Sequence, residues 1–224
     1  MGDTRTGEAQ YREAIELMKK YPERMGLMSG WSWHDDPKRL VFFLSRYKFV
    51  AKMLAGFGHV LEVGCGDGFG TRIVVQAVGR LTAVDFDPEF IGSAKDIMSE
   101  RWPFTCLVHD VLDKPVDGQF DAVFSLDVLE HISPQDEDRF LTHMVAPLKP
   151  GGVAIIGSPS IQSQAYASAQ SRIGHVNCKD QQELQHLMQR YFEHVFVFSM
   201  NDEVVHTGFH AMAHYNFCLC SGKK

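Results

Sequence analysis

Short apolar runs alternate with amphipathic stretches along most of this chain. Runs of β-branched and other apolar residues predict buried strands, whereas apolar positions spaced by three and four predict helices. The predicted strands cover residues 58–63, 80–85, 104–108, 121–126, 152–157, 194–200 and 212–220. The predicted helices between them cover residues 70–78, 88–101, 135–147 and 179–192. This alternation favours an α/β fold with a doubly wound, seven-stranded and mostly parallel sheet that is covered on both faces.

The later part of the chain departs from this alternation in two places. No helix is predicted between the last two strands, which predicts an antiparallel hairpin at the edge of the sheet. Residues 159–176 are polar, small and irregular, and we interpret them as a long loop after the fifth strand. Long loops in compact domains are more often functional than idle. Ser133-Pro134 has the pattern of a helix start, and a capping box with Asp136 is expected there.

The region before the first strand has helical patterns of its own. A first helix is predicted at residues 8–20, and a second runs from Pro37 to about residue 54 with Asp36 as its N-cap. The segment 26–36 between them is interpreted as a loop. The predicted domains are N-terminal helices with a lid that packs on the core, residues 1–55, and a sheet domain, residues 56–224.

Composition narrows the class of protein. The chain has 224 residues, of which 45% are hydrophobic, so one α/β domain with a modest extension is expected. Its formal charge of −6 argues against nucleic-acid binding, which normally needs a basic patch. No signal-peptide pattern and no apolar run of membrane-spanning length occurs, so we expect a cytoplasmic protein without membrane contact. Five cysteines without zinc-site spacing make a disulfide framework improbable.

The first predicted strand ends in a glycine-rich turn. The run Glu62-Val63-Gly64-Cys65-Gly66 leads through further glycines into a helical pattern. Glycine lets the backbone turn sharply and approach a ligand closely. A strand, glycine turn and helix form the nucleotide crevice of a doubly wound sheet. Glu62 would repel a pyrophosphate but suits an amine or a hydroxyl group, which favours S-adenosylmethionine over NAD.

Three further markers follow the glycine turn in order. Asp85 ends the second strand about 20 residues later, where an acid reaches the ribose hydroxyls of an adenosine ligand. Asp110 follows the third strand and is placed to accept a hydrogen bond from an adenine amine. The fourth strand ends at Leu126-Asp127 and leads into a polar turn. Each marker alone is weak, but the four together, in this order and spacing, are specific.

With these markers the chain resembles the class I S-adenosylmethionine-dependent methyltransferases, over about residues 38–158. The resemblance implies a Rossmann-like fold and S-adenosylmethionine as cofactor. By the same resemblance, Asp85 would bind the ribose, Phe86 would cover the adenine, and Leu126 would lie beside the sulfonium. The cofactor-binding residues expected in this way are Glu62, Gly64, Cys65, Gly66, Asp85, Phe86, Asp110, Val111, Leu126 and Asp127. Arg46 or Tyr47 in the lid region is a further candidate, for the methionine carboxylate.

Candidate residues for the methyl acceptor lie on the loops after the fourth and fifth strands. His131 is the first candidate for a catalytic base because its ordinary pKa is near neutrality. The alternative is that it only packs or forms a local hydrogen bond. His175 and Asn177 end the long loop, where a catalytic or substrate-binding role competes with a loop-ordering hydrogen bond.

Other substrate candidates are less specific. Trp33 in the lid segment suits closure over the ligand or packing of the helices. Asn201 and His206 in the last hairpin suit substrate contact or a solvated loop. His206, His210 and His214 recur every four residues, but Gly208 argues against a helix there, so no metal site is expected.

The expected function is methyl transfer to a small soluble acceptor, with a hydroxyl of a sugar, glycan precursor or secondary metabolite favoured. N-methylation of a small molecule and non-catalytic binding of S-adenosylmethionine by a regulator remain open, as does a homodimer. A short-chain dehydrogenase is disfavoured because none of the six tyrosines has a lysine four residues later.

Overall fold

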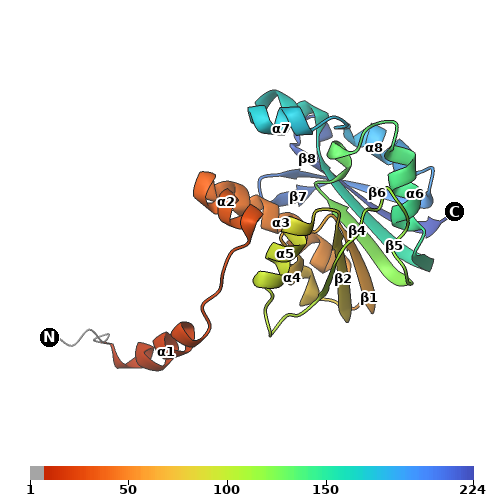
Figure 1. Ribbon diagram of the computed structural model, residues 1–224. Helices are drawn as coiled ribbons and strands as arrows, with labels where there is room; N and C mark the ends of the chain where they lie inside the picture. The colour runs from red at the N-terminus through yellow and green to blue at the C-terminus, as the bar shows by residue number, and fades with distance from the viewer. Residues whose placement is uncertain (1–7) are drawn as a thin grey trace.

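An eight-stranded sheet forms the centre of the molecule (Figure 1). The computed structural model describes residues 8–224. The strands are β1 (His59–Val63), β2 (Arg80–Asp85), β3 (Thr105–Val108), β4 (Phe120–Leu126), β5 (Leu148–Pro159), β6 (Phe192–Asn201), β7 (Val204–His206) and β8 (Tyr215–Lys223). The α-helices are α1 (Arg12–Lys20), α2 (Leu27–Asp35), α3 (Pro37–Met53), α4 (Thr71–Val75), α5 (Pro88–Asp96), α6 (Glu137–Val145), α7 (Ala169–Gly174) and α8 (Gln181–Met188). Short 3-10 helices are η1 (Ala9–Tyr11), η2 (Leu129–His131), η3 (Ile161–Tyr166) and η4 (His210–Met212).

The strand order is β3-β2-β1-β4-β5-β8-β6-β7. The strands from β3 to β5 in this order pair in parallel. β8 is antiparallel to both β5 and β6, and the short β7 adds a further antiparallel strand at the edge. The predicted fold class and the antiparallel edge are therefore confirmed. The sheet has eight strands rather than seven because a turn at Asp202 reverses the chain and pairs three more residues with β6.

Two hydrophobic clusters cover the two faces of the sheet. Successive residues of β1 point to opposite faces, so Val60 belongs to one cluster and Leu61 to the other. The Leu61 side packs under α6 and α8, whereas the Val60 side packs under α3, α4 and α5 (Figure 1). Because both faces are covered, the cavity that a ligand needs has to form at an edge, where the parallel strands end.

The predicted loop at residues 26–36 is wrong, because α2 occupies it. Its first turn is held by a long-range contact: the backbone N–H and the hydroxyl of Ser29 both donate to Oδ2 of Asp67, at 2.8 Å each. Asp67 lies 38 residues further along, in the glycine turn. Local sequence could not reveal this cap, and its effect is to seat α2 on the glycine turn.

The predicted irregular loop at 159–176 also contains helical turns, η3 and α7. Ser160 and Ser168 each accept a hydrogen bond from a backbone N–H three residues later, which is the pattern of an N-cap. Helix α6 begins at Glu137, two residues after the predicted start, because Ser133 donates its hydroxyl to Asp136 and does not cap a backbone N–H. Helices α4 and α5 end earlier than predicted.

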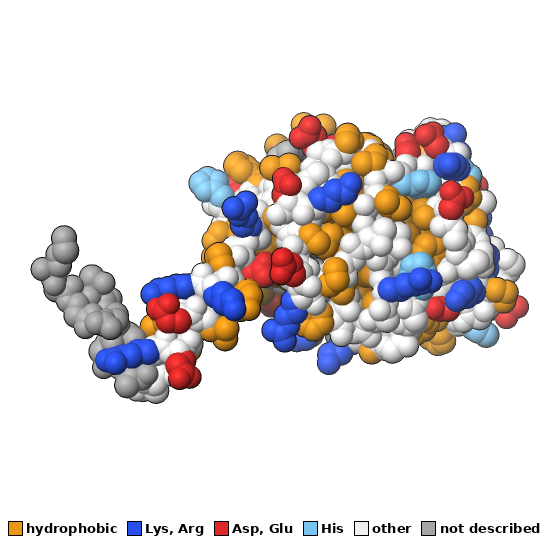
Figure 2. All heavy atoms as spheres, turned by 60° about the horizontal axis from the view of Figure 1, so that its bottom comes forward, with side chains coloured by type: hydrophobic (Ala, Val, Ile, Leu, Met, Phe, Trp, Pro, Cys, Tyr) orange, Lys and Arg blue, Asp and Glu red, His pale blue; other side chains and the backbone are white. Residues whose placement is uncertain are grey.

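The N-terminal helices differ in how they meet the sheet. Tyr47, Val50 and Leu54 at the end of α3 are buried in the core, whereas α1 has no buried residue and stands apart from the body (Figure 1). The division into residues 1–55 and 56–224 stays a prediction. On the face seen in Figure 2, side chains of both charge signs are interspersed over the body. None of the described helices has the length and apolar character needed to cross a membrane.

Candidate functional site

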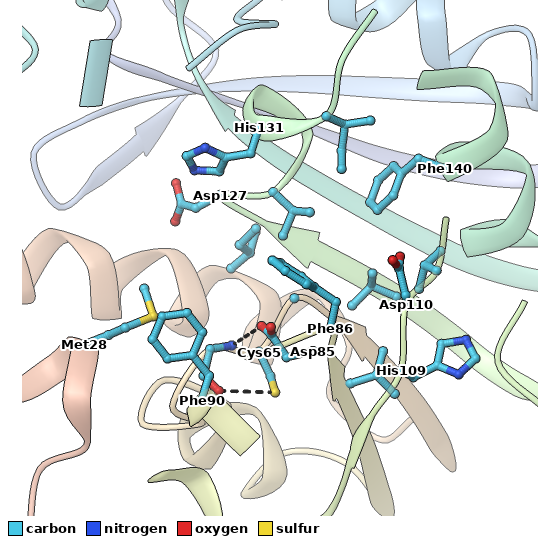
Figure 3. A pocket seen from close by; sticks show the side chains of 18 of the residues that line it. Met28, Cys65, Asp85, Phe86, Phe90, His109, Asp110, Asp127, His131 and Phe140 are labelled. Carbon is cyan, nitrogen blue, oxygen red and sulfur yellow. Dashed lines mark hydrogen bonds between the residues drawn. The ribbon is translucent and has the colours of Figure 1, made fainter. Parts of the chain in front are cut away.

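A cavity of about 520 Å³ opens at the carboxyl ends of β1, β2 and β4 (Figure 3). The parallel register places the glycine turn, Asp85 and Asp127 next to one another there. Residues from the lid helices also form its wall, including Met28 of α2 and Tyr47 of α3. Sequence segments far apart in the chain therefore meet around one space, as expected for a nucleotide crevice.

At the glycine turn, the cavity wall is made largely of backbone atoms. Gly64 and Gly66 have φ values of 82° and 54°, in the region that favours glycine. A Cβ on Gly64 would lie 2.1 Å from Cγ2 of Val128, and one on Gly66 would lie 2.6 Å from Sδ of Met28. Neither position has room for a side chain, so the turn is closely packed between the lid and the turn after β4. Cys65 between them is buried and also lines the cavity.

Asp85 is fixed at the end of β2 by two backbone donors. The N–H of Gly66 donates to its Oδ2 at 2.9 Å, and the N–H of Asp87 donates to its Oδ1 at 3.0 Å. Burial raises the pKa of Asp85, while these two N–H groups oppose the rise. The carboxyl group is therefore held against the glycine turn and lines the cavity, in the position predicted for a ribose acceptor.

The wall beyond Asp85 combines apolar side chains with one acid. Phe86 is 69% exposed and Val111 is buried, and both line the cavity together with Asp110. Oδ1 of Asp110 accepts from the N–H of Leu112 at 2.8 Å, so its second oxygen carries no hydrogen bond from the described backbone in this turn. Figure 3 shows Phe86 and Asp110 on the same side of the cavity, away from His131. The four residues predicted for the adenosine, Asp85, Phe86, Asp110 and Val111, are thus brought together.

Asp127 forms a buried ion pair with Arg46. Nη1 of Arg46 lies 2.5 Å from Oδ1 of Asp127, and the guanidinium lies 3.9 Å from the centre of the Tyr215 ring. The backbone of Asp127 is left-handed, with a φ of 57°, and its N–H donates to the carbonyl of Gly157 at 3.1 Å. Leu126 and Asp127 both line the cavity. Arg46 lies behind Asp127 rather than among the lining residues, so its binding of a methionine carboxylate stays a prediction.

Glu62 is buried beneath the glycine turn rather than exposed in the cavity wall, and only 1% of its surface is accessible. Burial raises its pKa to about 7, although the neighbouring hydroxyl groups of Thr71 and Tyr47 oppose the rise. Neither carboxyl oxygen has a hydrogen-bond partner among the described residues. With a pKa of about 7, Glu62 is close to half protonated at neutral pH.

This pKa predicts that Glu62→Gln is more stable than the unchanged protein at alkaline pH. Between pH 4.5 and 7 the unfolded chain loses this proton while the folded chain keeps it, so folding becomes less favourable as pH rises. Above pH 7 the cost is constant, at about 3 kcal/mol. Urea unfolding at pH 5 and pH 8 should show the advantage of Glu62→Gln growing with pH. The exposed-site variant Glu100→Gln is the control. A gain in stability of Glu62→Gln that does not change with pH, or an equal gain in Glu100→Gln, would contradict this account of Glu62.

The structure brings the two predicted catalytic histidines together. The ring centres of His131 and His175 lie 5.1 Å apart. The loop carrying His175 is tied to η2, because the N–H groups of Val176 and Asn177 both donate to the carbonyl of Glu130, at 2.8 and 3.0 Å. His131 lines the cavity, and burial with the nearby His131 lowers the pKa of His175. Both histidines therefore belong to one end of the site.

Glu130, beside these histidines, was not singled out in the sequence. Its side chain is 1% exposed, and burial together with the nearby Asp127 raises its pKa well above the ordinary value. Nothing in the local sequence Leu129-Glu130-His131 indicates that the glutamate side chain is buried.

The four predicted substrate residues do not line this cavity. Trp33 is 55% exposed on α2. Asn177 donates to Glu137 and accepts from Lys179, at 2.7 and 2.9 Å. Asn201 donates to the carbonyl of Met212, and Nε2 of His206 lies 2.7 Å from Oδ1 of Asn201. In this structure Asn177, Asn201 and His206 order loops, and their substrate contacts stay predictions.

Several apolar wall residues were missed by sequence reasoning. Met28 lies in the segment interpreted as a loop, and Phe43 lies on α3, one turn before Tyr47. Phe90 lies in the first turn of α5, shortly after Asp85. Its position in the sequence could therefore have indicated that it lines the cavity. Phe140 of α6 had no such signal, because only the packing of α6 brings it to the cavity.

A parallel sheet with a glycine turn after β1, an acid at the end of β2 and an antiparallel β8 is a Rossmann-like α/β fold of the methyltransferase type. A sequence profile of the methyltransferase domain matches residues 60–152. The predicted resemblance to the class I S-adenosylmethionine-dependent methyltransferases is therefore confirmed.

Individual relatives match over different parts of the chain. A probable S-adenosylmethionine-dependent methyltransferase of Mycolicibacterium smegmatis is 28% identical over 116 residues, which cover 51% of this chain and 42% of that protein. A ubiquinone biosynthesis O-methyltransferase of Xanthomonas campestris is 29% identical over 149 residues, which cover 64% of this chain and 62% of that protein. The matches therefore span less than two thirds of these relatives' lengths.

A solved structure matches over nearly the whole chain. The fold is similar to that of the N-methyltransferase NodS from Bradyrhizobium japonicum, in complex with S-adenosyl-L-homocysteine, with a TM-score of 0.66 and 19% identity. The match covers 94% of this chain and 97% of NodS.

Proposed function

We propose that this protein transfers the methyl group of S-adenosylmethionine to a small acceptor, with a hydroxyl acceptor favoured. The observation that carries the proposal is a single cavity that joins the glycine turn and Asp85 at one end to His131 at the other. The family supports the reaction class. The relative from Xanthomonas campestris is named an O-methyltransferase, and the structural neighbour NodS is named an N-methyltransferase.

The residues at the Asp85 end fit an adenosyl ligand. The glycine turn offers backbone at a cavity wall where a Cβ on Gly64 or Gly66 would collide with Val128 or Met28. Asp85 is placed to accept hydrogen bonds from ribose hydroxyls. Phe86 and Val111 offer apolar surface to the adenine, and Asp110 offers a free carboxyl oxygen to its amine. Leu126 and Asp127 would lie beside the methionine part, with Glu62 beneath the turn.

S-adenosylmethionine supplies, when bound, a methyl group already activated by the positive charge on sulfur. The protein then has to align the acceptor and exclude water, and such positioning is worth up to about 7–11 kcal/mol. Met28, Phe43 and Phe140 provide apolar walls that keep water out. A hydroxyl acceptor must also lose its proton, and His131 and His175 offer ring nitrogens at that end. An amine acceptor would need less help, which is why a hydroxyl of a sugar, glycan precursor or secondary metabolite is favoured.

Asp85→Ala tests the cofactor end. The variant is expected to bind S-adenosylhomocysteine more weakly by about 1–3 kcal/mol, or about 5- to 150-fold in Kd, because hydrogen bonds to a charged carboxylate are lost. Isothermal titration calorimetry measures this directly, with the exposed Asp117→Ala as the matched control. Equal affinities in Asp85→Ala and Asp117→Ala would remove Asp85 from the site.

A turnover assay tests the reaction itself. The protein is incubated with S-adenosylmethionine and a panel of hydroxyl and amine acceptors, and production of S-adenosylhomocysteine is measured. The proposal predicts turnover with hydroxyl acceptors. Turnover with amines alone would favour N-methylation, and saturable cofactor binding without turnover across the panel would favour a regulator.

A further inference from the structure

Three side chains of metal-ligand type converge at the acceptor end of the cavity. Glu130 and His131 lie on η2, and His175 follows α7. One ligating atom from each lies within 4.8 Å of the others. The hydrogen bonds from Val176 and Asn177 to the carbonyl of Glu130 fix the two segments against each other, so this convergence is built into the backbone.

The two imidazole rings are held in one orientation by acceptors. Nδ1 of His131 lies 2.9 Å from the carbonyl oxygen of Gly174, and Nδ1 of His175 lies 2.9 Å from Oε1 of Gln164. A carbonyl oxygen only accepts, so Nδ1 must carry the hydrogen in both rings. In the neutral rings Nε2 then has the free lone pair. Metal-binding histidines are commonly oriented in this way, by an outer acceptor on the other nitrogen.

Glu130 supplies a buried carboxyl group beside these rings. Its side chain is 1% exposed, and Oε2 has no hydrogen-bond partner among the described residues. Leaving a buried carboxyl oxygen without a partner is costly. Arg46, whose positive charge acts on Glu130, is already paired with Asp127. One ligating atom of Glu130 and one of each ring therefore lie close together, and Oε2 of Glu130 has no hydrogen-bond partner among the described residues.

We infer that Glu130, His131 and His175 form a binding site for a divalent transition-metal ion at the acceptor end of the cavity. Two imidazoles and one carboxylate are the ligand set of many sites for Zn²⁺ and related ions, and three protein ligands leave coordination positions open. His131 lines the cavity (Figure 3), so an acceptor bound there would meet these open positions.

This inference rests on the proposed function and states how the histidines would act in it. A bound divalent ion lowers the pKa of an oxygen ligand. The O–H bond of the acceptor then breaks and its proton goes to solvent, since the lone pairs of the histidines are occupied by the ion. The acceptor oxygen forms the new C–O bond while the C–S bond to the methyl donor breaks.

Metal binding by the full chain tests the inference without relying on turnover. The chelator-treated protein is titrated with Zn²⁺ by calorimetry and with Co²⁺ by visible absorption. One ion per chain is expected, and His131→Ala and His175→Ala should each weaken binding by at least about tenfold. The exposed His186→Ala is the matched control and should bind as the unchanged protein does. Circular dichroism verifies that the variants are folded.

Two outcomes would overturn the metal site. One is the lack of saturable binding, in which case the histidines only order the loop. The other is binding that neither His131→Ala nor His175→Ala weakens. A parallel titration with S-adenosylhomocysteine separates this result from the proposed function. If the unchanged protein binds S-adenosylhomocysteine but no metal, only the metal site is overturned. If the unchanged protein does not bind S-adenosylhomocysteine, the proposed function is overturned.

Discussion

His131→Ala is expected to reduce turnover by about 10²–10⁴-fold, the usual contribution of a group that assists proton removal. His131 is the histidine of the pair that lines the cavity, so its ring is the one that an acceptor meets first. Affinity for S-adenosylhomocysteine should change little, because Asp85 and the glycine turn lie at the other end of the site (Figure 3). Steady-state turnover and calorimetry on the same preparation measure the two quantities.

The loss of turnover has to be separated from a disturbed loop, because Nδ1 of His131 also contacts the carbonyl of Gly174. His131→Asn retains a side-chain donor for that contact but removes the Nε2 lone pair, and it should be as inactive as His131→Ala. His186→Ala controls for the loss of an exposed histidine. Near-normal turnover in both His131 variants would remove this residue from the reaction.

Arg46→Met is expected to lower the free energy of unfolding by about 3–5 kcal/mol, the cost of leaving one partner of a buried ion pair alone. Arg46 and Asp127 are mostly buried, with 11% and 24% of their side chains exposed. The variant keeps an unbranched apolar stem but removes the guanidinium, which leaves the carboxylate of Asp127 without its cation. Urea unfolding of the unchanged protein and the variant measures the difference.

Two comparisons sharpen this prediction. The exposed pair of Arg139 and Asp136 offers a matched control, and Arg139→Met should cost less than about 1 kcal/mol. Adding Asp127→Asn to Arg46→Met should recover part of the loss, because the stranded charge is then gone. If Arg46→Met costs no more than Arg139→Met, the ion pair does not hold the turn after β4 in place.

The parts of the fold that the sequence predicted well depend on local patterns. Each parallel strand is a short apolar run, and the glycine turn and Asp85 stand directly at strand ends. Parallel strands end at the same edge, so the residues that follow them meet without any further information. For the same reason Asp85 and Gly66 could be expected at one site, and the structure joins them by a hydrogen bond.

The parts that were missed depend on contacts between distant segments. Helix α2 is held by Asp67, which no local pattern connects to Ser29. The sequence nominated His131 and His175 separately, but their pairing depends on backbone hydrogen bonds from Val176 and Asn177 to the carbonyl of Glu130. Lid residues such as Met28 reach the cavity only because α2 is seated on the glycine turn. Tertiary contacts of this kind decide which candidates share a site.

The site has two ends that differ in chemistry. The Asp85 end combines backbone, apolar surface and hydrogen-bond acceptors, and it is suited to holding an adenosyl group. The His131 end collects ionisable side chains, from the exposed His131 to the buried Glu130 with its unpartnered oxygen. Asp127 lies at the end of β4, lines the same cavity and is held by Arg46. In the proposed function, cofactor recognition and acceptor activation belong to separate residues, so the two can be tested by separate variants.

The most direct test of the account is a crystal structure of the full chain grown with S-adenosylhomocysteine. We expect density for the compound along the glycine turn, its ribose hydroxyls hydrogen-bonded to Asp85 and its sulfur on the side of the cavity that faces His131. An empty cavity at saturating concentration, or the compound bound away from Asp85, would contradict it.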